Sequence, residues 1–375
     1  MRKWRLACAL GVAAVSMLAL SASSVASGSH VHMTVIASGL DNPRDLAFGP
    51  GGRLFVAEAG HGGSHCIPGG EEGDTCIGFT SKIGIVNVAK HRVRHVVTGL
   101  VSLAGKDGTA ATGVDGIDVL GRSSIYGIIT ESQDIVPPTG FTAAFRAHVR
   151  SQLGRLIRAS VNGTWHTVAN VGHRNFIWTG QHKNLVPGQF PDSNPYGVFA
   201  KSNREQWVVD AGANTINRID ARGRVHVVAF LPNPQASDAV PTCIDRGPDG
   251  ALYVGELTGG GNPPGSSVVW RFAPWQKHHR LTTWARGLTA VTGCGFGHDG
   301  RFYAVELSTL GLENGAPNTG ALVRVPPHSS HPVKLLGGLS FPGGFAAGND
   351  GALYFSNWSI APSSLGAGSV VRVTL

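Results

Sequence analysis

One phrase recurs along this chain of 375 residues and constrains its fold more than any other feature. The copies are "GPGGRLFVAEAG", "GPDGALYVGELTG", "GHDGRFYAVELS" and "GNDGALYFSNWS", which begin at Gly49, Gly247, Gly297 and Gly348. Each contains an Asp-Gly or Gly-Gly pair, which supplies the positive φ of a tight hairpin turn, and then an apolar and aromatic run with strand propensity. The phrase therefore predicts a turn and a strand that usually ends in an acid.

The spacing of this phrase and its weaker relatives predicts six repeats. Aligning the apolar runs places the starts of the units near Pro43, Gly113, Pro195, Pro241, Thr292 and Pro342. Each unit has room for four antiparallel strands, which is the pattern of a β-propeller. The 53 Gly, 21 Pro and 14% charged residues also fit an all-β protein rich in turns. We predict a six-bladed β-propeller with four-stranded blades.

The last unit lacks one strand, and the start of the chain offers a spare one. "MTVIASGL" (Met33 to Leu40) resembles the fourth strands "RHVVTGL" and "TTWARGL". Pairing it with the last blade would close the ring and remove the open edges of the sheet. We therefore expect residues 27–375 to form a single propeller domain.

Residues 1–26 have the pattern of a secretory signal peptide. A basic start precedes an apolar stretch from Leu6 to Leu20, and small residues follow it up to a cleavage site near Ala26. No later segment is long and apolar enough to predict a membrane span. We expect the mature protein to be secreted.

The charge of the chain argues against nucleic acid as a partner. The formal net charge is +8, and the basic residues are scattered rather than clustered with aromatic residues. We expect a monomer whose partner is a small polar molecule or an extracellular or envelope protein.

Four cysteines remain after the leader, and an exported protein is expected to oxidise them. Four cysteines allow three pairings. Cys66 and Cys76 share a Gly-rich insertion, whereas Cys243 and Cys294 lie on neighbouring units one position out of register, so the pleat turns them to opposite faces. These features favour the pairs Cys66–Cys76 and Cys243–Cys294. The alternative is a metal site made of His61, His65, Cys66 and Cys76, although its spacing fits no zinc pattern.

Several stretches resemble the ScyD/ScyE family of exported propeller proteins. They are "GLDNPRDLAFGPGGRLFVAEAG", "DGTAATGVDGIDV", "DSNPYGV", "VVDAGANTINRID" and "VPTCIDRGPDGALYVGELTG", and the resemblance covers essentially the whole mature chain. The shorter phrase "PDGALYV" also occurs in NHL-repeat, gluconolactonase-like and sugar-dehydrogenase-like propellers. The resemblance implies a fold and export rather than an activity. The second unit departs from the repeat, because Ile129 stands where the others carry an acid or Asn.

The residues that close the second strand of five units form a recurring polar position: Glu58, Asp210, Glu256, Glu306 and Asn357. A ring of carboxylates could hold a hard cation such as Ca²⁺. Alternatively, each acid accepts backbone N–H groups in the turn that follows it. We favour the second interpretation, because a part repeated in nearly every blade serves the blade. We expect no organic cofactor, and Ca²⁺ remains the alternative.

An asymmetric site is expected at the starts of the innermost strands, which line the central channel. The polar residues there form the predicted channel mouth: Arg44, Asp45, Asp115, Asn194, Tyr196, Thr242 and Thr292. They include no histidine that could act as a hydride-abstracting base, and only Asp45, Asp115 and Asn194 could ligate a cation.

The sequence thus favours a secreted binding or scaffold protein that presents the channel mouth to a ligand. The alternative is an enzyme acting in the channel mouth, either a metal-dependent hydrolase of the lactonase type or an oxidoreductase of the sugar-dehydrogenase type. The motifs of serine hydrolases, HExxH zinc enzymes and P-loop proteins do not occur in the chain.

Overall fold

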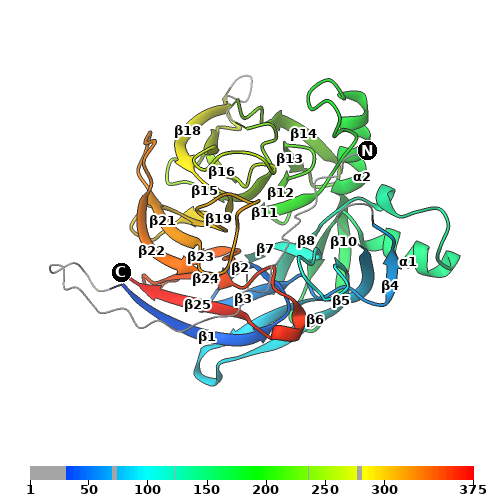
Figure 1. Ribbon diagram of the computed structural model, residues 1–375, viewed down its shortest axis with the longest axis horizontal. Helices are drawn as coiled ribbons and strands as arrows, with labels where there is room; N and C mark the ends of the chain where they lie inside the picture. Colours follow the sequence, from blue (N-terminus) through cyan, green and yellow to red (C-terminus); the bar gives the residue numbers. More distant parts are fainter. Residues whose placement is uncertain (1–30, 70–73, 122, 235, 277–280) are drawn as a thin grey trace.

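A computed structural model describes residues 31–69, 74–121, 123–234, 236–276 and 281–375. These residues form a six-bladed β-propeller of antiparallel blades (Figure 1), as the repeat predicts. The predicted signal peptide, residues 1–26, lies outside the described residues.

The longest connections lie within blades 1 and 2 and between blades 2 and 3. Blade 1 consists of β2 (Pro43–Gly49), β3 (Arg53–Glu58), β5 (Thr75–Asn87) and β6 (Arg92–Ala104), with the short β4 (His65–Ile67) added beside β5. Blade 2 consists of β7 (Val114–Leu120), β8 (Ser124–Ile129), β9 (Arg155–Ala159) and β10 (Trp165–Asn170). Blade 3 consists of β11 (Pro195–Ser202), β12 (Glu205–Asp210), β13 (Thr215–Ile219) and β14 (Val225–Phe230).

Blades 4 to 6 follow the same order of strands from the centre outward. Blade 4 consists of β15 (Pro241–Arg246), β16 (Leu252–Glu256), β17 (Ser267–Phe272) and β18 (Leu281–Leu288). Blade 5 consists of β19 (Val291–Phe296), β20 (Phe302–Glu306), β21 (Gly320–Val325) and β22 (Val333–Leu339). Blade 6 takes β23 (Phe345–Ala347), β24 (Leu353–Asn357) and β25 (Gly368–Thr374) from the end of the chain. The first strand of each blade lies nearest the centre of the ring (Figure 1).

The N-terminal strand closes the ring. β1 (His32–Leu40) is the outer strand of blade 6, where it pairs antiparallel with β25 from His32 opposite Thr374 to Leu40 opposite Gly368. This confirms the predicted closure. The ends of the described chain are thereby held in one sheet, so β25 has a partner on both sides.

The repeated phrase has a structural role that explains its recurrence. Asp249 accepts the Ala251 N–H within its turn, and its other oxygen accepts from the Tyr253 hydroxyl (3.2 Å) and from Arg271 Nε (2.7 Å). Asp350 makes the same contacts with Ala352, Tyr354 and Arg372 in blade 6. The aspartate of the Asp-Gly pair therefore ties its turn to the second and third strands of its own blade.

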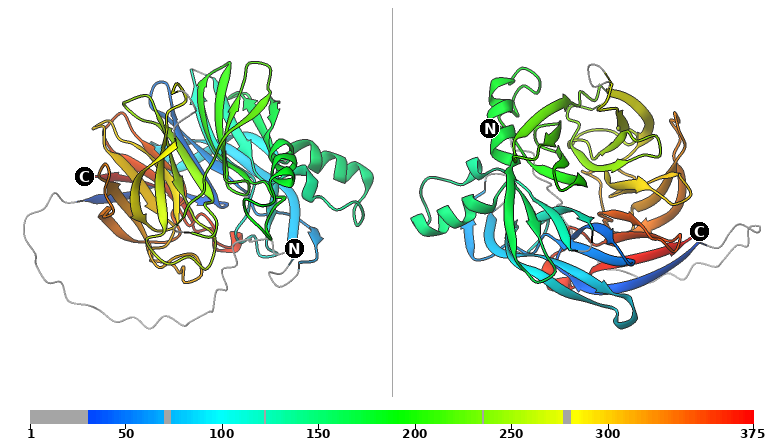
Figure 2. Two further views of the ribbon diagram at one scale, coloured as in Figure 1. Left: turned by 90° about the horizontal axis from the view of Figure 1, so that it is seen from above. Right: turned by 180° about the vertical axis from the view of Figure 1, so that it is seen from behind.

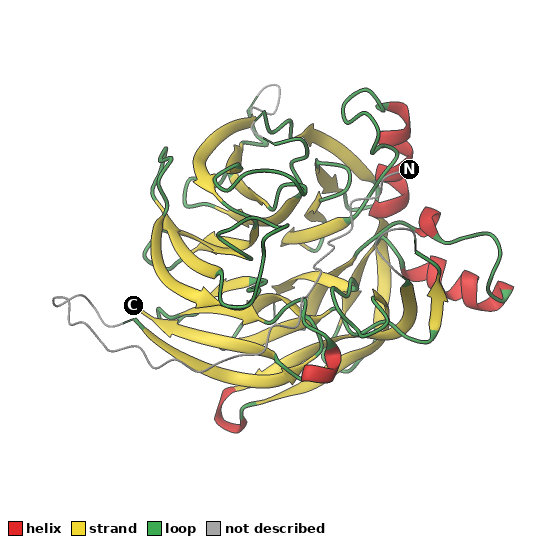
Figure 3. Cartoon of the chain, viewed as in Figure 1, coloured by secondary structure: helices red, strands yellow, loops and turns green. Residues whose placement is uncertain are grey.

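Two helices occupy the connections of blade 2 and of the chain that leads into blade 3. α1 (Ala143–Gln152) begins at the N-cap Thr142, and α2 (Val171–Gln181) begins at the N-cap Asn170. Both lie outside the ring of strands (Figure 3), and the segment around α1 projects away from it in both views of Figure 2. The short 3-10 helices are η1 (Val88–Lys90), η2 (Gln133–Ile135) and η3 (Ser363–Leu365).

Both disulfides have the pairing that the sequence favours. Cys66 and Cys76 join β4 to β5, which leaves no free thiolates for the alternative metal site with His61 and His65. Cys243 and Cys294 join the innermost strands of blades 4 and 5. A Cβ at Gly255 would lie 2.7 Å from the Cys243 sulfur, so this position in β16 accommodates only glycine beside the disulfide.

Candidate functional site

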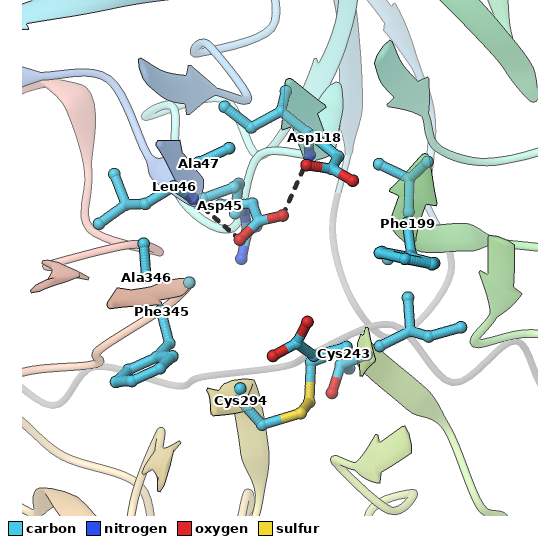
Figure 4. Close-up of a pocket in the computed structure, with 18 of the residues that line it drawn as sticks. Asp45, Leu46, Ala47, Asp118, Phe199, Cys243, Cys294, Phe345 and Ala346 are labelled. Atoms are coloured by element: carbon cyan, nitrogen blue, oxygen red, sulfur yellow. Dashed lines mark hydrogen bonds between the residues drawn. A yellow bond between two sulfur atoms is a disulfide. The ribbon is translucent and has the colours of Figure 1, made fainter. Parts of the chain in front are cut away.

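A pocket of about 280 Å³ occupies the central channel. It is lined by the innermost strands of all six blades, β2, β7, β11, β15, β19 and β23. Figure 4 shows the side chains of Asp45, Asp118, Phe199 and Phe345 around this space. The pocket is therefore the point where all six blades contribute side chains to one cavity.

The pocket opens at the end of the channel where the innermost strands end. Arg44, near the start of its strand, is buried, whereas Phe48 and Phe296 near the strand ends are partly exposed and His298, just after β19, is exposed. Asp115, Thr242 and Thr292 are buried as well. The strand starts thus form the floor of the pocket.

An apolar cluster covers the floor end of the channel. Ala290 and Phe341 precede innermost strands, and Leu257 and Leu307 follow second strands, so all four lie at the end where the innermost strands begin. The Ala110 N–H donates to the Ile360 carbonyl (3.2 Å) and joins the loop before blade 2 to a loop of blade 6. This covering arises from loops far apart in the sequence.

The predicted channel-mouth residues are largely brought together, but at the buried end. Six of them line the pocket: Arg44, Asp45, Asp115, Tyr196, Thr242 and Thr292. Asn194 is not among the lining residues, and its Oδ1 accepts the Glu131 N–H (3.2 Å). Thr242 and Thr292 donate their hydroxyls to Val291 O (2.7 Å) and Pro342 O (2.8 Å) of the next blade. These threonines therefore link blades as well as line the floor.

Arg44 and Asp115 form a buried ion pair in the floor. Arg44 Nε lies 3.9 Å from Asp115 Oδ1, and the two side chains are 5% and 0% exposed. Arg44 also donates to the Ala111 carbonyl and to the Tyr196 hydroxyl (3.5 Å), and Asp115 Oδ1 accepts the Gly113 N–H (3.0 Å). Within the described part of the chain, Arg44 Nε and Asp115 Oδ2 have no hydrogen-bond partner.

Burial sets the protonation of this floor. It raises the pKa of Asp115 to about 6, while the Arg44 charge opposes the rise. Burial also raises the pKa of Tyr196 to about 12, so its hydroxyl stays protonated at neutral pH. The floor thus offers a guanidinium, a carboxyl group and a neutral phenol.

Two further acids line the pocket, Asp118 and Asp245, which the sequence analysis does not predict as site residues. They occupy the same register, because Asp118 pairs with Tyr126 and Asp245 with Tyr253 on the second strands of their blades. For Asp118 the signal is an acid inside the otherwise apolar run "IDVL", and for Asp245 it is an acid at the equivalent position of "IDRG".

Three channel acids share one hydrogen-bonding pattern across blade boundaries. Asp45 Oδ2 accepts the Ile117 N–H (3.0 Å), and Asp118 Oδ2 accepts the Ala200 N–H (2.7 Å). Asp245 Oδ2 accepts the Phe296 N–H (2.8 Å) in the same way. Among the described residues, the innermost strands have no strand partner on the channel side. These carboxylates therefore accept N–H groups that would otherwise have no hydrogen-bond acceptor.

Burial raises the pKa values of all three acids, and neighbouring carboxylates add to the rise at Asp45 and Asp245. Burial and then the charges of Asp118 and Asp245 raise the pKa of Asp45 to about 7, against the hydrogen bonds from Ile117 and Leu46. Burial raises the pKa of Asp118, and burial with the Asp118 charge raises that of Asp245 to about 6. The pocket therefore holds carboxyl groups that titrate near neutral pH.

The acids at the ends of the second strands bind the loop that leads into their own blade. Glu58, Asp210 and Glu306 accept the N–H groups of Asp41, Asn194 and Thr289, and Asn357 accepts that of Ser340. The prediction that the turn after each acid supplies these donors holds, among the described residues, only for Asp210, which also accepts from Gly212 and Ala213. Glu256 accepts from the side chains of Asn233 (2.6 Å) and Trp270.

Metal-ligating side chains do not gather in the described residues. Within those ranges, no group of three or more His, Cys, Asp or Glu side chains is arranged to hold a metal ion. None of the helices in these residues has the length and hydrophobicity needed to cross a membrane.

Comparisons with known proteins identify the fold. No family model matches the chain, and no curated protein is significantly similar in sequence. A Thermus thermophilus protein described as an oxidoreductase (glucose dehydrogenase) superposes with a TM-score of 0.53 at 16% identity, covering 92% of this chain and 100% of that chain. A Xanthomonas campestris gluconolactonase gives a TM-score of 0.53 at 9% identity, covering 92% and 90%. A luciferin-regenerating enzyme gives 0.50 at 10% identity, covering 92% and 96%. This chain is similar to all three in fold, and their descriptions name different activities, so the fold alone assigns none.

Proposed function

We propose that this protein is an exported binding protein that holds a small polar molecule in its channel pocket. The observation that carries the proposal is the pair of unpartnered polar atoms in the floor, Arg44 Nε and Asp115 Oδ2. Native proteins rarely leave buried polar groups without partners, because each such group costs about 1–3 kcal/mol. A ligand that both donates and accepts a hydrogen bond, such as a hydroxyl group, would satisfy both atoms.

The architecture supports binding in this place. The pocket is concave, combines apolar walls with a few polar groups, and lies where six blades converge. Its acids and the floor ion pair come from blades 1, 2 and 4, so the site breaks the symmetry of the repeat. Export is supported by the leader pattern and by the two disulfides. The resemblance to the ScyD/ScyE family points to the same compartment.

Melting temperatures measured against a panel of small polyols, sugars, amino alcohols and carboxylates test the proposal. We expect at least one compound to raise the melting temperature of the wild-type protein through mass action. The double variant Arg44→Met, Asp115→Asn removes the ion pair without leaving a lone buried charge, and it should abolish the shift. Glu313→Gln, an exposed acid outside the pocket, is the control that should keep it.

Activity assays on the same purified protein test the alternative, which is catalysis. Turnover of a sugar lactone with and without Ca²⁺, or reduction of a dye by a sugar, would assign the protein to the hydrolases or oxidoreductases instead. Binding without turnover supports the proposal, and a panel with no binding compound contradicts it.

A further inference from the structure

We infer that the ligand of the channel pocket is a small organic cation that also carries a hydroxyl or similar polar group. Asp45, Asp118 and Asp245 would surround its cationic group, and Arg44 and Asp115 would hydrogen-bond its polar group. This inference rests on the proposed function and adds the chemical class of the ligand.

The charge of the side chains that line the pocket favours a cationic ligand. Four carboxyl groups line it, from Asp45, Asp115, Asp118 and Asp245, whereas Arg44 is the one permanent cation among the described lining residues. The imidazole of His298 lies at the exposed rim. Asp115 already has Arg44 as a partner, so the other three carboxylates lack a counter-charge within the pocket.

The carboxylates have free capacity to bind a cation. Each oxygen of Asp118 accepts one N–H, from Val119 (2.7 Å) and from Ala200 (2.7 Å). The two oxygens of Asp45 likewise accept one N–H each, from Leu46 and from Ile117. A carboxylate oxygen has two lone pairs, so one on each oxygen remains available to a further donor or a positive charge. The backbone bonds hold these groups in place while leaving that capacity open.

The walls between the acids suit an organic rather than an inorganic cation. The rings of Phe199 and Phe345 flank the space on opposite sides (Figure 4), and Phe48 and Phe296 also line the pocket. Aromatic faces attract ammonium groups and gain from burying their carbon atoms. The acids come from three blades and do not converge as a metal-ligand group within the described residues. A cavity of about 280 Å³ fits a small molecule rather than a bare ion.

The floor of the pocket indicates a polar group on the ligand, independently of Asp45, Asp118 and Asp245. Asp115 is fully buried, lines the pocket and has an oxygen, Oδ2, without a hydrogen-bond partner in the described structure. Arg44 Nε beside it likewise has no hydrogen-bond acceptor among the described residues. This donor and acceptor match a hydroxyl group, which would place the polar end of the ligand deep and its cationic end among the three aspartates.

Choline and its uncharged analogue 3,3-dimethylbutan-1-ol form a matched pair of probes for the full-length protein. They have nearly the same shape and hydroxyl group, so a difference in affinity reports the charge. In calorimetric titrations we expect choline, or ethanolamine as the primary-amine counterpart, to bind at least about tenfold more tightly than the neutral analogue. Equal affinity of the charged and neutral members would overturn the inference.

Variants locate the binding. Asp118→Asn and Asp245→Asn should each weaken the amine probes by about tenfold or more while leaving any neutral analogue nearly unaffected. Glu313→Gln should bind as the wild type does. Melting temperatures show whether each variant is folded, and if the Asn variants are unstable the wild-type comparison of probes still decides the question.

The outcomes separate this inference from the proposed function. A neutral polyol that binds and is lost in the Arg44→Met, Asp115→Asn variant would keep the binding function and overturn the organic cation. Binding of Ca²⁺ that depends on Asp118 and Asp245, with no binding of the amines, would also overturn it. Failure of every compound to bind would contradict both proposals.

Discussion

A carboxylate that accepts a backbone N–H from the next blade recurs around the channel of this propeller. Asp45, Asp118 and Asp245 all do so, and each also accepts the N–H of the residue that follows it. The same side chains therefore fix the blade boundaries and present charge to the pocket. Stability and ligand binding are linked at these residues.

The raised pKa of Asp45 predicts how stability depends on pH. An acid whose pKa rises on folding keeps its proton in the folded state at pH values where the unfolded chain has lost it, so stability falls as pH increases. For Asp45 this window extends from about pH 4 to about pH 7. Asp118, Asp245 and Asp115, which face the same pocket, act in the same direction.

We therefore expect the ligand-free protein to melt at a higher temperature at pH 5 than at pH 8. Asp45→Asn should reduce that difference, because it removes one titrating group, whereas Glu313→Gln should leave it unchanged. Thermal melts across this pH range measure the effect. A wild-type protein that is more stable at pH 8, or an Asp45→Asn variant with an unaltered pH dependence, would show that the channel acids are not the cause.

Glu256 and Glu306 provide a second residue-scale prediction. Both oxygens of Glu256 accept hydrogen bonds, from Trp270 and Asn233, whereas one oxygen of Glu306 accepts the Thr289 N–H. Glutamine keeps one acceptor, so Glu256→Gln should lower the free energy of unfolding by about 1–3 kcal/mol and Glu306→Gln by less. The two effects should add, since the residues belong to different blades and share none of these partners.

Thermal melts with calcium and with chelator distinguish this arrangement from a shared cation. If both acids held one Ca²⁺, each single variant would lose the same calcium-dependent rise in melting temperature, and the double variant would cost little more than either. That result would restore the metal interpretation of the second-strand acids.

At the scale of the element, β1 is the strand that the sheet topology makes indispensable. It covers the edge of β25 and buries Ile36 and Ala37 in the core between blades 6 and 1. A chain that lacks residues 32–40 would expose the N–H and C=O groups of β25 to other molecules. We expect this deletion to yield aggregated protein, or protein with a much lower melting temperature, in light scattering and thermal melts.

A chain that begins at residue 31 is the matched control and should behave like the wild type. Equal stability of the two shortened chains would mean that the ring does not depend on β1.

The blades could be predicted from sequence because their signals are local. A turn with Asp-Gly at Asp249, the strand that follows it and the opposite pleat parity of Cys243 and Cys294 can all be identified within one or two units. The repeat does not predict the helices α1 and α2, because they lie in insertions outside it. Their caps, Thr142 and Asn170, are weak signals without the periodic pattern around them.

The site was harder to predict than the fold because it depends on contacts between distant segments. The strand positions of Arg44 and Asp115 predict that both lie at the channel, but they do not reveal the side on which the pocket opens. The end of the channel where the innermost strands begin is covered by Phe341, Ile360 and their apolar neighbours in other loops. The local pattern can mark Asp118 and Asp245 as acids on innermost strands, but it does not show that they accept N–H groups of the next blade.

For the whole molecule, the two disulfides stabilise the ring by different amounts. Cys243–Cys294 closes a sequence separation of 51 residues across two blades, whereas Cys66–Cys76 closes one of 10 within blade 1. The chain-entropy relation gives about 4 kcal/mol for the first and about 3 kcal/mol for the second. Denaturant unfolding of the two double Cys→Ala variants should therefore show the larger loss for Cys243 and Cys294. A larger loss for the Cys66 and Cys76 variant would contradict this order.

The ring as a whole brings six strands to one cavity. We propose that this cavity holds a small molecule. Native mass spectrometry of the protein purified from an exporting host tests that claim most directly, by comparing the intact mass under native and denaturing conditions. We predict that the wild-type protein, alone or with added choline, retains one small molecule that the Arg44→Met, Asp115→Asn variant does not retain. A wild-type protein that retains nothing, or a folded double variant that retains the same molecule undiminished, would contradict the claim.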